Sequence, residues 1–119
     1  MIKRILLVDD SPMIHALLRK ALEKNGYEIC GDANNGKEAV EMFKKLTPDL
    51  VFMDITMPIM DGIEASTKIK QLNSQARIIM LSAMGDEEII AHAKSIGIDT
   101  FLKKPFKEDM VIGAISATK

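Results

Sequence analysis

The sequence predicts an α/β fold, an open, doubly wound parallel sheet of five strands with five helices. Four short apolar runs support this, because continuous runs of this length are typical of strands buried on both faces of a parallel sheet. They span residues 5–8, 50–53, 78–81 and 101–102. Segments with apolar residues at helical spacing separate the runs, so strands and helices alternate. Strict alternation predicts right-handed crossovers with helices on both faces, although it leaves the strand order open.

The first helix has a marked start and a marked end. Ser11 can cap it, and Pro12 suits the first helical position, where no backbone N–H is needed. The Asn25-Gly26 pair favours a stop. The apolar positions between these ends are Ile14, Leu17, Leu18, Ala21 and Leu22. The strand that follows, at residues 27–31, is short and less apolar, which favours a place near an edge of the sheet.

The second helix begins with a capping pattern. Asn35 is followed three residues later by Glu38, a spacing that resembles a capping box. The helix ends at Thr47-Pro48, because a residue before proline is disfavoured in the helical region. Its apolar positions are Ala39, Val40, Phe43 and Leu46.

Three further helices complete the pattern. Asp61-Gly62 begins the third helix. Asp86 can cap the fourth, which ends at Gly97, and the fifth helix starts near Lys107. The residues expected to face the core on these helices are Ile63, Ser66, Ile69, Leu72, Ile89, Ile90, Ala93, Ile96, Met110, Val111, Ala114 and Ile115.

Composition bounds the class of protein. A chain of 119 residues predicts one domain, spanning 1–119, with a proper core. With 16 basic against 17 acidic residues the net charge is −1, which points to neither a nucleic-acid nor a membrane partner. A single cysteine, Cys30, excludes an internal disulfide and suits a reducing compartment. Because there is neither a membrane-length apolar stretch nor a secretory signal layout, we expect a cytoplasmic monomer.

Four of the five predicted strands, those formed by the apolar runs, end at side chains that can do chemistry. Asp9 and Asp10 follow the first run, Asp54 follows the third strand, and Ser82 and Lys104 follow the last two. The carboxyl ends of parallel strands lie side by side, and ligands bind in the crevice outside them. Three carboxylates brought together repel one another unless a cation compensates, and oxygen ligands of this kind suit Mg²⁺.

This set of side chains predicts phosphoryl chemistry. A carboxylate beside Mg²⁺ can attack phosphorus and form an aspartyl phosphate. Asp54 is the expected nucleophile because it stands alone at its strand end, whereas Asp9 and Asp10 are placed to hold metal. Lys104 supplies an ammonium and Ser82 a hydroxyl for the phosphoryl oxygens. Taken singly, each residue has a structural explanation, such as a helix start or a surface charge. Their joint occurrence at successive strand ends favours the functional interpretation.

At these residues the chain resembles the receiver domains of two-component response regulators. The matching stretches are Val8-Asp9-Asp10-Ser11, Met53-Asp54-Ile55-Thr56-Met57-Pro58, Asp61-Gly62, Leu81-Ser82-Ala83 and Lys103-Lys104-Pro105-Phe106. Their order and separation match from residue 3 to the end of the chain, and the stand-alone chemotaxis regulators are the most similar. The resemblance implies the flavodoxin-like strand order 2-1-3-4-5.

The resemblance also implies roles for individual residues. Asp54 would be the phosphoacceptor. Asp10 and Asp54 would ligate Mg²⁺ together with the backbone carbonyl of Thr56, and Asp9 would act through a metal-bound water. Thr56, two residues after the acceptor, occupies the position that in this family tunes the phosphate lifetime.

Other roles implied by the resemblance concern the switch. Ser82 and Lys104 would contact the phosphoryl oxygens, and the Lys104-Pro105 bond is expected to be cis. Ser82 would move toward the phosphate, and Phe101, at the position of the family's switching aromatic, would fill the vacated space. The face formed by residues 86–119 would then bind a protein target.

The implied partners are a histidine kinase as phosphodonor and a downstream protein, for which the flagellar motor switch is the first expectation. A phosphorelay intermediate, or a receiver cut from a larger regulator, is the alternative. The chain would catalyse only its own phosphorylation and dephosphorylation.

Two enzyme or carrier classes share parts of the pattern. A haloacid-dehalogenase-like phosphatase needs a second acid two residues after the nucleophile, where this chain has Thr56, and usually a cap insertion. A flavodoxin-like carrier would suffer repulsion between its flavin phosphate and the Asp9-Asp10 pair.

Of the two histidines, His15 is expected on the polar side of the first helix and His92 within the fourth, both solvated rather than functional.

Overall fold

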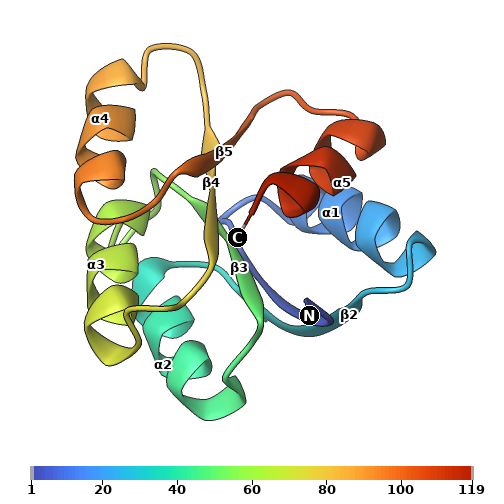
Figure 1. Cartoon of the computed structure of the whole chain (residues 1–119), viewed down its shortest axis with the longest axis horizontal. Helices are drawn as coiled ribbons and strands as arrows, with labels where there is room; N and C mark the ends of the chain where they lie inside the picture. The colour runs from blue at the N-terminus through green and yellow to red at the C-terminus, as the bar shows by residue number, and fades with distance from the viewer. Residues whose placement is uncertain (1, 119) are drawn as a thin grey trace.

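The computed structural model describes residues 2–118 and contains one parallel five-stranded sheet in the order β2-β1-β3-β4-β5 (Figure 1). The predicted fold class and strand order are confirmed. The strands are β1 (Arg4–Val8), β2 (Glu28–Ala33), β3 (Leu50–Asp54), β4 (Ile78–Ser82) and β5 (Thr100–Lys103). The helices are α1 (Pro12–Lys24), α2 (Gly36–Leu46), α3 (Gly62–Leu72), α4 (Glu87–Ser95) and α5 (Glu108–Ala117). Residues 1 and 119, which end the expected domain and target-binding segment, lie outside the described residues.

Helices cover both faces of the sheet, with α1 and α5 on one side and α2, α3 and α4 on the other (Figure 1). The alternation of side chains along β1 divides the core accordingly. Leu6 and Val8 pack toward α2, α3 and α4, whereas Ile5 and Leu7 pack toward α1 and α5. Burial on both faces explains why the central strands are apolar throughout rather than alternating. The less apolar β2 lies at an edge, as expected.

The register brings the strand ends to one edge of the sheet. Val8 pairs with Met53, so Asp9 and Asp54 each follow directly in neighbouring strands. Asp54 pairs with Leu81, and Ser82 with Lys103. The predicted convergence of the strand ends is therefore present.

No helix within residues 2–118 has the length and apolar character that crossing a bilayer requires.

The helix caps agree with the sequence at two sites and differ at two others. Asn35 caps α2 by accepting a hydrogen bond of 2.9 Å from the Glu38 amide, and Asp61 caps α3 in the same way. Ser11 stands at the start of α1 but makes no side-chain capping bond. Asp86 does not cap α4, because its carboxylate instead accepts a 2.7 Å bond from the Ala83 amide in the preceding loop.

Three apolar positions expected to face the core are substantially exposed. Leu17 is 47% exposed, Leu72 is 49% exposed and Met110 is 43% exposed. The helices α1, α3 and α5 therefore contact the sheet through fewer of their apolar positions than helical periodicity predicts. Ser66, by contrast, is fully buried as predicted.

Candidate functional site

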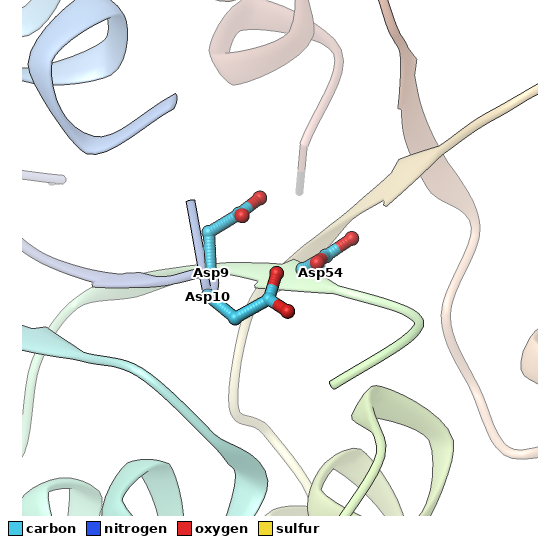
Figure 2. A group of neighbouring side chains, drawn as sticks. All are labelled: Asp9, Asp10 and Asp54. Carbon is cyan, nitrogen blue, oxygen red and sulfur yellow. The ribbon is translucent and has the colours of Figure 1, made fainter. Parts of the chain in front are cut away.

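Three aspartates gather at the carboxyl edge of the sheet. Asp9 and Asp10 follow β1 and Asp54 ends β3, and Figure 2 shows their carboxylates grouped across the ends of the two strands. One carboxylate oxygen from each residue lies within 4.8 Å of the others. Asp9 and Asp54 are buried while Asp10 is exposed, so solvent reaches the cluster from the side of Asp10.

Lys104 joins two of these acids. Its Nζ donates hydrogen bonds to Asp9 Oδ2 at 2.9 Å and to Asp54 Oδ1 at 3.1 Å. The backbone holds Lys104 in place, because its amide donates a hydrogen bond of 2.7 Å to the Ser82 carbonyl. The Lys104-Pro105 bond is cis, as expected. Burial by itself lowers the Lys104 pKa, but the bonds and charges of Asp9 and Asp54 outweigh burial, and the pKa is raised above its usual value.

Asp54 carries an unfavourable charge in this site. Burial is the largest cause, and the neighbouring Asp9 carboxylate adds to it, so the pKa of Asp54 is raised to about 6 despite the opposing Lys104 ammonium. The Lys104 ammonium is shared by Asp9 and Asp54, and among the described hydrogen bonds and ion pairs it has no contact with Asp10, so the acids outnumber their positive partner. The ligands are all oxygens and the charge excess is negative, so Asp9, Asp10 and Asp54 fit a hard divalent cation such as Mg²⁺.

The main chain of Asp9 is held on both sides. Its amide donates to the Ala33 carbonyl of β2 at 3.1 Å, and its own carbonyl lies 2.7 Å from His15 Nε2. Its Oδ1 accepts a hydrogen bond of 2.8 Å from the Ser11 amide.

The expectation that His15 is solvated is wrong, because its side chain is only 11% exposed and hydrogen-bonded at both ring nitrogens.

The loop after Asp54 is pinned by a close backbone approach. A Cβ on Gly62 would lie 1.9 Å from the Asp54 carbonyl oxygen, and the Gly62 amide donates to the Ile55 carbonyl at 2.7 Å. Only glycine permits this contact. Thr56 is exposed in this loop, and Ile59 has a φ of 71°, a left-handed conformation that β-branched residues rarely adopt. The sequence marked Gly62 as a helix start, but it did not indicate the close approach.

A cavity of about 230 Å³ lies beside Asp54. Its lining residues are Asp54, Ile55, Thr56, Leu81, Ser82, Ala83, Asp86 and Lys104. It thus contains three of the side chains predicted to serve the acceptor site, namely Ser82, Thr56 and Lys104. Phe101 does not line the cavity. It is half-buried on β5, packs on the core beneath α4, and lies with its ring centroid 6.0 Å from Lys94 Nζ.

Comparison with known proteins defines the class. The profile of the response regulator receiver domain matches residues 5–116, and the chain belongs to this family. Members of the family are regulators rather than enzymes with a separate substrate.

Among individual proteins, the chain is 49% identical to the chemotaxis protein CheY of Bacillus subtilis over 99% of this chain and 98% of that protein. It is 50% identical to CheY of Halobacterium salinarum over 98% and 96% of the two chains. Its fold matches the Borrelia burgdorferi structure described as a CheX-CheY-BeF3-Mg²⁺ complex with a TM-score of 0.92, at 34% identity and with coverage of 97% and 87%. The chain is therefore a CheY-like receiver domain.

Proposed function

We propose that this receiver is a phosphorylation-operated switch in which Asp54 accepts a phosphoryl group from a histidine kinase. The observation that carries the proposal is the 3.1 Å contact of Lys104 with Asp54 inside the acidic cluster. In the transfer, an Asp54 oxygen forms a bond to phosphorus as the bond from phosphorus to the kinase imidazole nitrogen breaks. The imidazole keeps the electron pair. Lys104 and the Ser82 hydroxyl donate to the phosphoryl oxygens as their charge develops.

A divalent cation has a defined place in this proposal. Asp10 and Asp54 would ligate Mg²⁺ together with the Thr56 carbonyl, and Asp9 would hold it through water. When bound, Mg²⁺ offsets the charge of the acids and of the incoming phosphoryl group. The Borrelia burgdorferi CheY complex contains both Mg²⁺ and BeF3, and BeF3 has the charge and shape of a phosphoryl group on a carboxylate. A relative of the same fold that is found with both species supports a magnesium-dependent phosphoryl site in this chain.

The output would pass through β5. A phosphoryl group on Asp54 would occupy the cavity that Ser82 lines, and movement of Ser82 toward it would free space behind β4. Phe101, which pairs with Met80 of β4 in the sheet register, would then turn inward into that space. Since Phe101 has no hydroxyl, the turn changes burial without making a new hydrogen bond. The surface of α4, β5 and α5 would then bind a protein target.

The relatives indicate which target to test first. The CheY proteins of Bacillus subtilis and Halobacterium salinarum are both named for chemotaxis, which supports the flagellar motor switch as the partner of the phosphorylated form. Binding of this chain to a flagellar switch protein should require both Mg²⁺ and a phosphodonor. Equal binding by the unphosphorylated protein would contradict the proposed output.

Phosphoryl acceptance has a direct test. Acetyl phosphate with Mg²⁺ should add one phosphoryl group to the wild type, and Asp54→Asn should abolish the addition, as read by intact-mass spectrometry. Asp99→Asn, at an exposed position before β5, is the matched control and should be modified like the wild type. Undiminished modification of Asp54→Asn would falsify the acceptor assignment.

A further inference from the structure

Asp9 and Asp10 are consecutive residues whose side chains reach the same site, and regular strand geometry does not explain this. Consecutive residues of a β-strand point to opposite faces, yet Asp9 and Asp10 both place a carboxylate oxygen within 4.8 Å of one from Asp54. β1 ends at Val8, so the chain turns just where the two acids follow. The orientation of the peptide between Asp9 and Asp10 decides whether both side chains reach the same pocket.

One side chain holds that peptide. The carbonyl of Asp9 is the oxygen of the Asp9-Asp10 peptide unit, and it accepts a 2.7 Å hydrogen bond from His15 Nε2. The Asp9 amide is already bound to the Ala33 carbonyl. The Val8-Asp9 peptide unit is thus bonded to β2 and the Asp9-Asp10 unit to α1, and both hydrogen bonds oppose a rotation of the peptide plane between the two acids.

His15 is itself held in position. Its Nδ1 lies 2.8 Å from Asp32 Oδ1, and the other Asp32 oxygen is hydrogen-bonded to Arg19. A bond at one ring nitrogen fixes the direction in which the other nitrogen points. The Asp9 carbonyl oxygen can only accept a hydrogen bond, so the ring donates from Nε2 in that contact. Arg19, Asp32 and His15 thus form a chain of contacts that ends at the Asp9 carbonyl.

We propose that His15 is a positioning residue for the acid pair and that it determines how well Asp10 and Asp54 bind a divalent cation together. It acts through the main chain of Asp9 and does not touch the cation. This inference rests on the proposed Mg²⁺ site. A purely structural tie between α1 and β2 is the competing explanation, and it would affect stability without affecting metal affinity.

The test compares three substitutions at two positions. His15→Leu fills the space but removes both hydrogen bonds, while His15→Gln retains a donor near the Nε2 position. Glu23→Gln is the control, because Glu23 pairs with Arg19 at 3.4 Å and lies outside the contact to Asp9. Mg²⁺ affinity is measured by calorimetric titration, and the ¹³C shift of the Asp9 carbonyl carbon is measured in the metal-free protein.

The expected pattern is specific. His15→Leu should bind Mg²⁺ about tenfold more weakly, while His15→Gln and Glu23→Gln should stay within about threefold of the wild type. The Asp9 carbonyl shift should move in the Leu variant and be largely restored in the Gln variant. Wild-type affinity in a folded His15→Leu protein, or a Gln variant no better than Leu, would overturn the proposal.

If His15→Leu fails to fold, Asp32→Asn replaces it, because the Asp32 side chain is 39% exposed and its loss leaves the core intact. That variant should weaken Mg²⁺ binding by more than about threefold, beyond the range expected of the controls, and unchanged affinity counts against the role of His15. Failure of the wild type to bind Mg²⁺ would refute the proposed site itself, whereas the carbonyl shift, recorded without metal, reports separately on whether His15 holds the peptide.

Discussion

The ammonium of Lys104 lies 3.1 Å from a carboxylate oxygen of Asp54, a residue fifty positions earlier in the chain. The same Nζ lies 2.9 Å from Asp9, so one cation is shared by two buried acids. This arrangement places a positive charge where a phosphoryl group would develop negative charge, and it leaves the third acid, Asp10, without that partner among the described hydrogen bonds.

The shared lysine leads to a prediction about the role of charge. Lys104→Ala should bind Mg²⁺ at least as tightly as the wild type, because the cation then meets no positive competitor. The phosphorylated variant should fail to bind the target, since the group that pulls β5 toward the phosphoryl oxygens is gone. Calorimetry with Mg²⁺ and a target-binding assay would separate the two effects. A collapse of magnesium affinity in this variant would count against the assigned role.

The raised pKa of Asp54 predicts how stability depends on pH. Because the pKa of Asp54 is about 6 in the folded protein and near its usual value of 3.8 when unfolded, the folded state binds more protons between these values. The contribution of Asp54 to stability should therefore fall as pH rises from about 4 to about 6, by about 3 kcal/mol, and level off above.

Asp54→Asn isolates this effect. The variant should be more stable than the wild type at pH 7.5 in metal-free buffer, and the difference should shrink toward pH 4 as Asp54 becomes protonated in the wild type. Urea unfolding at several pH values measures the difference. A constant difference across this range would show that the charge of Asp54 is not its cause.

The close approach at Gly62 predicts opposite effects for two glycine substitutions. Gly62→Ala should destabilise the protein by about 3 kcal/mol, because its Cβ would lie 1.9 Å from the Asp54 carbonyl and the neighbours are backbone. Gly113→Ala, in α5 with no atom within 4 Å of the added Cβ, should instead stabilise by up to about 1 kcal/mol. Chemical denaturation measures both. Equal effects would refute the contact.

The left-handed backbone at Ile59 predicts a gain in stability. Ile59 has a φ of 71° and is 78% exposed, so neither packing nor conformation favours isoleucine there. Ile59→Asn should raise the free energy of unfolding by about 1 kcal/mol, because asparagine tolerates this region. Ile59→Val keeps the branched Cβ and should change little. A loss of stability in Ile59→Asn would show that the isoleucine side chain makes contacts that outweigh the backbone strain.

Local patterns in the sequence were enough to predict the strands, the helices and the order of the reactive side chains. Buried parallel strands require continuous apolar runs, and parallel pairing places every strand end at one edge, so local patterns place Asp9, Asp54 and Lys104 at the same edge. Which strands are neighbours there was implied by the family resemblance and not by the patterns. The Asn35 cap is equally local, because donor and acceptor lie three residues apart.

Contacts between separate helices and strands could be recognised only in the folded structure. His15 was expected in solvent because helical periodicity places it on a polar side, and only the packing of α1 beside β2 brings it to Asp32 and to the Asp9 carbonyl. The exposure of Leu17 and the close approach at Gly62 have the same origin. Spacing along a chain specifies which face a residue occupies, whereas its neighbours across that face depend on how rigid elements dock.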